Sequence, residues 1–370
     1  MSSTGQNRIE WIDLGKGVCM FLVVFYHVNP MYQDISAHAQ GVWREIVGLY
    51  ASVDWHLKTL RMPLFFFLSG LLAYRAIQRP WQSIAKKRIA LHLYLYLIWS
   101  LLNWLIIAHL APNPDTLSLK QGAFYADGIS SFVRQTLLGD NGLWYLYALP
   151  IYFCLCKTLN SLQPATILGL FTSLHIASEF FDLGFPLGAF CSNLVFFSAG
   201  ATVGLQIVDH LQRSSDDRLL AGFGISILFY AIGHKIISLN APEQSVTLIL
   251  QKCFLLSAGI HFFSFAQPLL KKNLNWLDTV FCNIGRNTLQ IYVFHYIFIV
   301  GINVYIAQRF FSEAGHLFYI VFPLASSAVV IALCLLASKA LGPAGGVLFD
   351  APFELRFPSV RAAKVRSSFE

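Results

Sequence analysis

About ten long apolar runs recur along the 370-residue chain, and they constrain the fold more than any other feature of the sequence. Only 12% of the residues are charged and 56% are hydrophobic, whereas roughly 25% are charged in ordinary soluble domains. A soluble core could not bury that much apolar surface, and about 20 consecutive apolar residues suffice to cross a bilayer as an α-helix. The sequence therefore predicts an all-α polytopic membrane protein, with about ten transmembrane helices in one bundle.

The apolar runs form one membrane domain over residues 8–341, and residues 342–370 follow as a short cytoplasmic tail. Because the first turn of a helix tolerates proline, Pro63, Pro164 and Pro186 are expected at the starts of three spans. The ten predicted spans cover residues 12–29, 62–78, 89–110, 142–159, 164–181, 186–208, 218–238, 245–269, 284–308 and 316–341.

The basic residues indicate how these spans are oriented. With the amino terminus in the cytoplasm, eighteen of the 26 Lys and Arg residues fall on the inside and seven on the outside. Cytoplasmic loops are enriched in Lys and Arg, so both termini are predicted to be cytoplasmic. Lys252 lies within a span, where an ion-pair partner such as Glu179 or Asp182 explains it at least as well as catalysis does. The net charge of +7 is spread over short loops and the tail, which argues against a nucleic-acid-binding surface.

The first span, "DLGKGVCMFLVVFYHV", carries three polar residues that lipid disfavours, namely Asp13, Lys16 and His27. A helix advances about 100° and 1.5 Å per residue, so Lys16 and His27 differ by about 20° in azimuth and by roughly 16 Å along the axis. Asp13 lies within about 60° of both. The three residues form a polar stripe on one face, and ionisable groups at membrane depth are functional candidates.

Arg61, at the start of the second predicted span, is expected at the same outer level as His27. If the first two spans are antiparallel neighbours, the two side chains form one site, in which the Arg61 cation would stabilise developing negative charge. The alternative is an interfacial histidine and a snorkelling arginine anchor. In the same span, Ser69 and Gly70 are interpreted as close-packing residues, because no nucleophile elbow surrounds Ser69.

Basic residues also gather in the short loop after this span, which contains Lys86, Lys87 and Arg88. The loop either sets the topology alone or binds the phosphates of a cytosolic cofactor. On the ninth span, Arg286 and His295 are nine residues apart and face opposite ways, so other helices must complete any site that they form. No metal site is expected, since no two histidines are three or four residues apart and no C-x-x-C occurs.

Four segments together resemble the acyltransferase 3 family, bacterial membrane enzymes that O-acylate cell-envelope and exported glycans. They are "RIEWIDLGKGVCMFLVVFYH", "RMPLFFFLSGLL", "LWYLYALPIYF" and "IGRNTLQIYVFH", and the resemblance extends from about Arg8 to Leu341. It implies a ten-helix core in the bacterial inner membrane that takes an acyl group, acetyl or succinyl, from cytosolic acyl-CoA. The implied acceptor is a hydroxyl of a glycan or lipid-linked saccharide on the outer side, and no permanently bound cofactor is implied.

The resemblance also assigns roles to individual residues. The essential histidine of the family falls on His27, its basic partner on Lys16, and the acid before the lysine on Asp13. The matching segments further contain four residues expected to contact substrate or to support residues that do, namely Trp144, Tyr145, Asn287 and His295.

The family's cytoplasmic R-x-x-R element is only partly present. Arg88 takes its first position, but Leu91 replaces the second arginine. Lys86 and Lys87 are therefore expected to substitute for that arginine in binding the acyl-CoA donor.

These assignments suit the chemistry of acyl transfer. A sugar hydroxyl is a weak nucleophile, and a histidine with an unperturbed pKa of about 6.5 can take its proton as the oxygen attacks a thioester. His27 is the predicted general base, and the roughly 16 Å to Lys16 is a length that the pantetheine arm of CoA can span. A glycan or lipid transporter is one alternative function, although such proteins more often show repeated halves and broken helices. A non-catalytic sensor or assembly partner is the other, and it would also explain the aromatic-rich outer loops.

Reporter fusions test the predicted orientation. A fusion after Asp115 should report the outside and a fusion after Arg213 the inside, because three and six predicted spans precede these positions. The opposite pair of results would overturn the predicted topology.

Overall fold

The computed structural model describes residues 9–37, 39–110, 126–238, 244–307, 317–342 and 344–350. All regular secondary structure within these ranges is helical, which confirms the predicted all-α class. The α-helices are α1 (Glu10–Ile35), α2 (Val42–Ile77), α3 (Trp81–Ala85), α4 (Leu91–Leu110), α5 (Ile129–Leu138), α6 (Trp144–Thr158), α7 (Pro164–Phe180), α8 (Leu187–Thr202), α9 (Gly204–Gln212), α10 (Asp216–Ser238), α11 (Gln244–Asn273), α12 (Asn275–Arg286), α13 (Thr288–Ile302), α15 (Leu317–Ala340) and α16 (Ala344–Phe349). Two π-helical segments, η1 (Lys86–Ala90) and η4 (Asn303–Ala307), join the chain before α4 and after α13.

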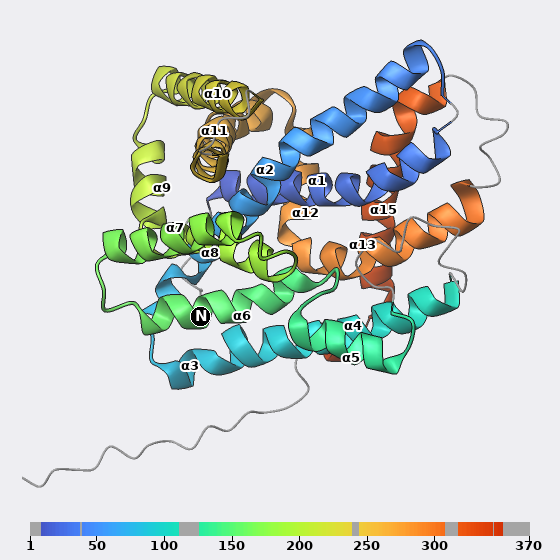
Figure 1. Ribbon diagram of the computed structural model, residues 1–370, viewed down its shortest axis with the longest axis horizontal. Coiled ribbons are helices and arrows are strands. Elements are labelled where there is room, and N and C mark those ends of the chain that lie inside the picture. The colour runs from blue at the N-terminus through green and yellow to red at the C-terminus, as the bar shows by residue number, and fades with distance from the viewer. Residues whose placement is uncertain are drawn as a thin grey trace, which may run out of the picture.

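Helix α1 crosses the middle of the bundle (Figure 1) and contacts α2, α11, α12, α13 and α15. It runs without a break from Glu10 to Ile35, so the predicted polar stripe does lie on one helix. Asp13 is buried, and Lys16 and His27 are partly buried. The stripe therefore faces protein neighbours, where a polar side chain can find partners that lipid does not offer.

Helix α2 corrects the predicted start of the second span. It begins at Val42, and Pro63 lies in its interior, so the prediction that Pro63 marks a helix start is wrong. Its 36 residues extend about 54 Å, well beyond a hydrocarbon core of roughly 30 Å. Hydropathy reports apolar runs, so the charged stretch before residue 62 has the pattern of a loop although it is part of the helix.

The other predicted spans each contain helix, but several are short or broken. Seven described helices are long and apolar enough to cross a membrane, or up to eight if α8 and α9, which are bent by 62°, form one span. Helices α6 and α7 have only 15 and 17 residues. Pro164 and Pro186 lie at helix starts as predicted, the first in α7 and the second directly before α8. The chain is thus a multi-pass helical membrane protein, and the count of ten spans stays a prediction.

The ninth predicted span is divided, which corrects the expectation of a single helix there. Helix α12 ends at Arg286 and α13 begins at Thr288, with Asn287 between them. Arg286 and His295 therefore belong to different helices, and each can face its own neighbours.

Two pairs of glycines allow helix backbones to touch. A Cβ atom at Gly70 on α2 would collide with the carbonyl oxygen of Phe197 on α8, and Gly200 on α8 meets the backbone of α2 in the same way. Gly17 on α1 and Gly285 on α12 make a second contact of this kind. Small residues permit such close approach in membrane bundles, which confirms the packing role predicted for Gly70.

Replacing Gly70 by alanine should therefore destabilise the protein. The added methyl group must push α2 away from α8, and overpacking of this kind costs about 1–3 kcal/mol. We expect Gly70→Ala to lower the thermal midpoint of unfolding in detergent. Gly169→Ala on α7, where a Cβ meets open space, should leave that midpoint unchanged. Equal midpoints for the two variants would contradict the close contact.

Candidate active site

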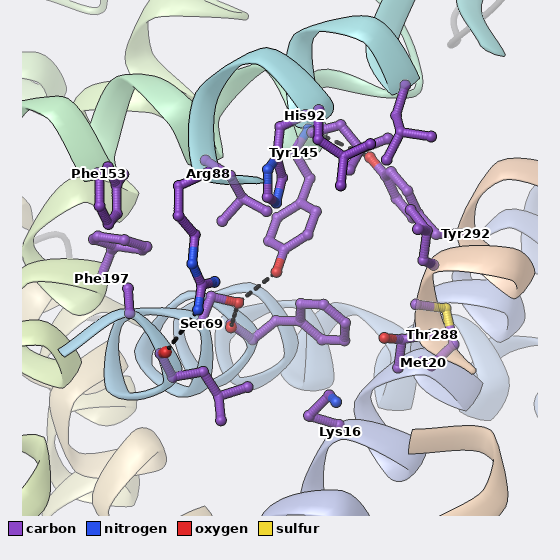
Figure 2. A pocket seen from close by; sticks show the side chains of 18 residues that line it. Lys16, Met20, Ser69, Arg88, His92, Tyr145, Phe153, Phe197, Thr288 and Tyr292 are labelled. Atoms are coloured by element: carbon purple, nitrogen blue, oxygen red, sulfur yellow. Dashed lines mark hydrogen bonds between the residues drawn. The ribbon is translucent and has the colours of Figure 1, made fainter. Parts of the chain in front are cut away.

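A cavity of about 320 Å³, called here the inner cavity, lies among α1, α2, η1, α4, α6, α8 and α13 (Figure 2). Its size is within the usual range of small-molecule sites, about 300–1,000 Å³. None of the described residues that line it is acidic, so its wall carries net positive charge. Its polar lining residues are Lys16, Ser69, Arg88, His92, Tyr145, Thr288 and Tyr292.

Lys16 enters the inner cavity from α1, opposite Arg88 (Figure 2). Its Nζ lies 4.0 Å from Oδ1 of Asp13, the partner that their i, i+3 spacing predicts. The other carboxylate oxygen of Asp13 lies 3.4 Å from Nε of Arg286 on α12. Asp13 thus bridges a cation in the cavity wall and a cation near the surface.

Arg88 enters the inner cavity from η1, where the backbone makes a wide turn in which the Leu91 N–H donates to the Lys86 carbonyl. Such π-helical turns are often found at functional sites. The Arg88 guanidinium donates to the Leu72 carbonyl on α2 at 3.2 Å, and Leu91 and His92 continue the wall. His92 was not predicted, although its position four residues after Arg88 places it on the same face of a helix.

Hydroxyl groups line the side of the inner cavity formed by α2 and α6. Ser69 Oγ donates to the Phe65 carbonyl at 2.8 Å, and the Tyr145 hydroxyl lies 2.5 Å from Ser69 Oγ. Tyr292 accepts a hydrogen bond from the Tyr145 N–H at 3.3 Å, and its hydroxyl donates to the Gly142 carbonyl at 2.9 Å. The Ser69 hydroxyl proton is therefore engaged with its own helix, which fits the packing interpretation.

His27 does not line the inner cavity but forms a pair with His295, whose ring centroid lies 5.1 Å away. His295 is fully buried, and its Nδ1 lies 2.7 Å from the Tyr292 carbonyl oxygen. This contact fixes the proton on Nδ1 and leaves Nε2 as an acceptor. No described residue donates a hydrogen bond to Nε2. The Tyr292 ring stacks on His295 at 5.8 Å and also lines the cavity, so it separates the cavity from the histidine pair.

Arg61 reaches the same neighbourhood through Tyr26. Its guanidinium lies 3.9 Å from the centroid of the Tyr26 ring, which contacts the His27 ring at 4.9 Å. Nη1 of Arg61 lies 2.9 Å from Oδ1 of Asp54, and the Asn29 amide donates to Oδ2 at 3.4 Å. The sequence interpretation missed Asp54 because it assigned this segment to a loop. Asp54 lies seven residues before Arg61, about two turns of a continuous helix, and this spacing is the signal that would have revealed the pair.

Three predicted site residues lie away from both the inner cavity and the histidine pair, and the side chain of a fourth is not described. Trp144 does not line the inner cavity and packs against Phe66 and Phe190. The Asn287 amide donates to the Asn283 carbonyl at the junction of α12 and α13. Lys86 is exposed outside the cavity, and the side chain of Lys87 lies outside the described residues.

Lys252 has the structural partner that was predicted. Its Nζ lies 3.1 Å from the Glu179 carboxylate and 3.3 Å from Nε2 of the buried His175. None of these three residues lines the inner cavity. The lysine is thus neutralised between α7 and α11, away from the candidate site.

A bundle of apolar helices around a positively charged cavity and a histidine pair defines an integral membrane protein with an internal site. The sequence profile of the family described as "Acyltransferase domain" matches residues 9–339, nearly the whole chain. The chain is 28% identical over 307 residues to the inner membrane protein YcfT of Escherichia coli (strain K12), an alignment that covers 78% of this chain and 79% of that protein. No solved structure matches the chain. The chain belongs to the acyltransferase 3 family, which confirms the resemblance, and it is a membrane acyltransferase.

Proposed function

We propose that this acyltransferase moves an acyl group, acetyl or succinyl, from cytosolic acyl-CoA to a hydroxyl of a cell-surface or exported glycan. We place it in a bacterial inner membrane, in line with the name of its relative. The observation that carries the proposal is a shared face of α1. At about 100° per residue, the azimuths of Lys16, Met20 and His27 around the helix axis fall within about 40° of one another. The first two line the inner cavity and the third contacts His295.

The inner cavity suits the donor. Acyl-CoA carries phosphates on a long, mostly neutral arm, and the cavity offers the cations Lys16 and Arg88 within a largely apolar wall. We propose that the arm lies in this cavity while the nucleotide stays outside, where Lys86 is exposed and Lys87 follows it in sequence. The thioester would then reach His27 past Met20 and Tyr292, so these side chains must move when the donor binds.

The histidine pair suits the proton transfer. In the proposed reaction His27 takes the proton of the sugar hydroxyl while the oxygen attacks the thioester carbonyl. The tetrahedral intermediate collapses to the sugar ester, the C–S bond breaks, and the CoA thiolate takes the proton back from His27. His295, held by its bond to Tyr292, orients the His27 ring and offers Nε2 as a second acceptor.

Arg61 would stabilise the negative charge on the thioester oxygen during the attack. Asp54 holds the Arg61 guanidinium at 2.9 Å in a buried position. A cation fixed in advance, away from water, needs no reorganisation when charge develops in the transition state.

Substitution of His27 tests the proposed base. His27→Ala should insert and fold but lose acyl transfer by about 10²- to 10⁴-fold, the usual contribution of a positioned base. His27→Gln keeps a hydrogen-bonding group but cannot take the proton, so it should lose as much. Transfer of labelled acetyl or succinyl from its CoA thioester to the cell-envelope glycan fraction measures this, with His210→Ala, exposed on α9, as the control. Near-normal transfer by His27→Gln would reduce His27 to a positioning residue.

Substitution of Arg88 tests the donor site separately. Arg88→Gln should raise KM for acyl-CoA by about tenfold or more, as expected for one lost charge-assisted contact, and change turnover at saturating donor much less. Arg213→Gln removes an exposed cation from another predicted inner segment and serves as the matched control. If both variants keep the wild-type KM for acyl-CoA, the positive charge of the loop only sets the topology.

A further inference from the structure

A second cavity, called here the outer cavity, lies between the end of α1 and the first turns of α2. Its volume is about 660 Å³, about twice that of the inner cavity. Figure 1 shows these two helix ends side by side at one edge of the bundle. Because α2 is about 54 Å long, it cannot lie wholly within a hydrocarbon core of roughly 30 Å, and this end of it begins with the charged residues Arg44 and Glu45.

The outer cavity is lined by polar side chains and by small apolar residues. Gln33, Ser36, Gln40 and Arg44 supply two amides, a hydroxyl and a guanidinium. The remaining wall is mostly alanine and glycine, which leaves room for a ligand. Amides bond sugar hydroxyls as both donors and acceptors, and a guanidinium pairs with a carboxylate or a phosphate.

The charge of the lining points to an anionic ligand. Arg44 is exposed, and none of the described residues that line the outer cavity is acidic. Ser36 also borders the cavity, but it is only 4% exposed. Arg44 is therefore the charged group in this lining that a ligand would meet, beside the amides of Gln33 and Gln40.

The outer cavity lies further along the same helices than the histidine pair. Gln33 follows His27 by six residues on α1, which is about 9 Å along the axis. Ala51, also in the lining, precedes Asp54 by about one turn of α2. The buried Asn29–Asp54 contact lies next along the same two helices. The inner cavity lies at the opposite end of this helical hairpin, so His27 stands between the two cavities.

We propose that the outer cavity binds the acceptor, and that the acceptor is a saccharide carrying a carboxylate or a phosphate, which Arg44 recognises. This inference rests on the proposed function, since only an acyl-transfer reaction needs a second substrate beside His27. The anionic group could belong to an acidic sugar of the glycan or to the phosphate of a lipid-linked saccharide, and separate probes distinguish these sources.

Gly48 offers a way to block the outer cavity without disturbing the fold. It lines the cavity in helical backbone, and a Cβ added there meets no atom within 4 Å. Gly48→Phe should fill the cavity, whereas Leu49→Phe adds an aromatic ring at the next, exposed position, which is not in the lining. Arg44→Gln removes the charge alone.

Binding is measured without donor, on purified protein in phosphatidylcholine nanodiscs. The probes are an oligogalacturonate, a lipid-linked disaccharide pyrophosphate, and a neutral malto-oligosaccharide of matched length. We expect at least one anionic probe to bind tenfold or more tightly than the neutral one. Gly48→Phe should abolish this binding and Arg44→Gln should remove the preference for charge, while Leu49→Phe binds as the unaltered protein does. Bound acetyl-CoA should be unchanged in all variants, which confirms folding.

The results separate this inference from the proposed function. Undiminished binding of the anionic probe by both Gly48→Phe and Arg44→Gln would overturn the assignment of the cavity. Equal affinity of the unaltered protein for anionic and neutral probes would overturn the charge selectivity, and so would saturation of the site by phosphatidylglycerol vesicles alone. Loss of binding in Gly48→Phe together with the absence of any acyl transfer in the unaltered protein would instead leave the saccharide site standing and refute the transfer reaction.

Discussion

The buried ion pair of Arg61 and Asp54 is the interaction on which the arrangement of the site depends. An unpaired guanidinium at membrane depth costs several kcal/mol, and removing one partner of a buried pair typically costs about 3–5 kcal/mol. The pair is only 2.9 Å apart, and the Asn29 amide joins it from α1. Both members of the ion pair belong to α2, and the Asn29 bond links the pair to α1. It thereby sets the cation beside Tyr26 and His27, with one cavity towards each end of the hairpin.

This order of parts matches what a transfer across a bilayer requires. Under the proposed function, the donor arrives in a positively charged cavity at one end and the acceptor in a polar cavity at the other. The Tyr292 ring stands between the inner cavity and His295, so it would keep the thioester from the histidine pair until the cavity is filled. Such a wall would limit hydrolysis of the donor by water entering from the outer side.

Features that depend on local pattern could be predicted from the sequence. Hydropathy was sufficient for the all-α membrane class, because apolar runs of this length leave few alternatives. Helical periodicity placed Asp13, Lys16 and His27 on one face, and charge alone required that Lys252 find an acid such as Glu179. The same rules failed at Pro63, which lies inside α2. Packing against α1 and the Arg61–Asp54 pair outweigh the local preference of proline for a helix start.

Contacts between segments far apart in the chain were decided only by the tertiary structure. The sequence determined that the protein is a helical membrane protein of the acyltransferase 3 family, with a basic loop and a histidine within the first span. It did not determine that Arg88 enters the inner cavity while Lys86 stays outside, nor that His295 from α13 meets His27 from α1. Those pairings depend on the crossing of helices at Gly17–Gly285 and Gly70–Gly200. Close backbone approach there sets distances that no property of a single helix encodes.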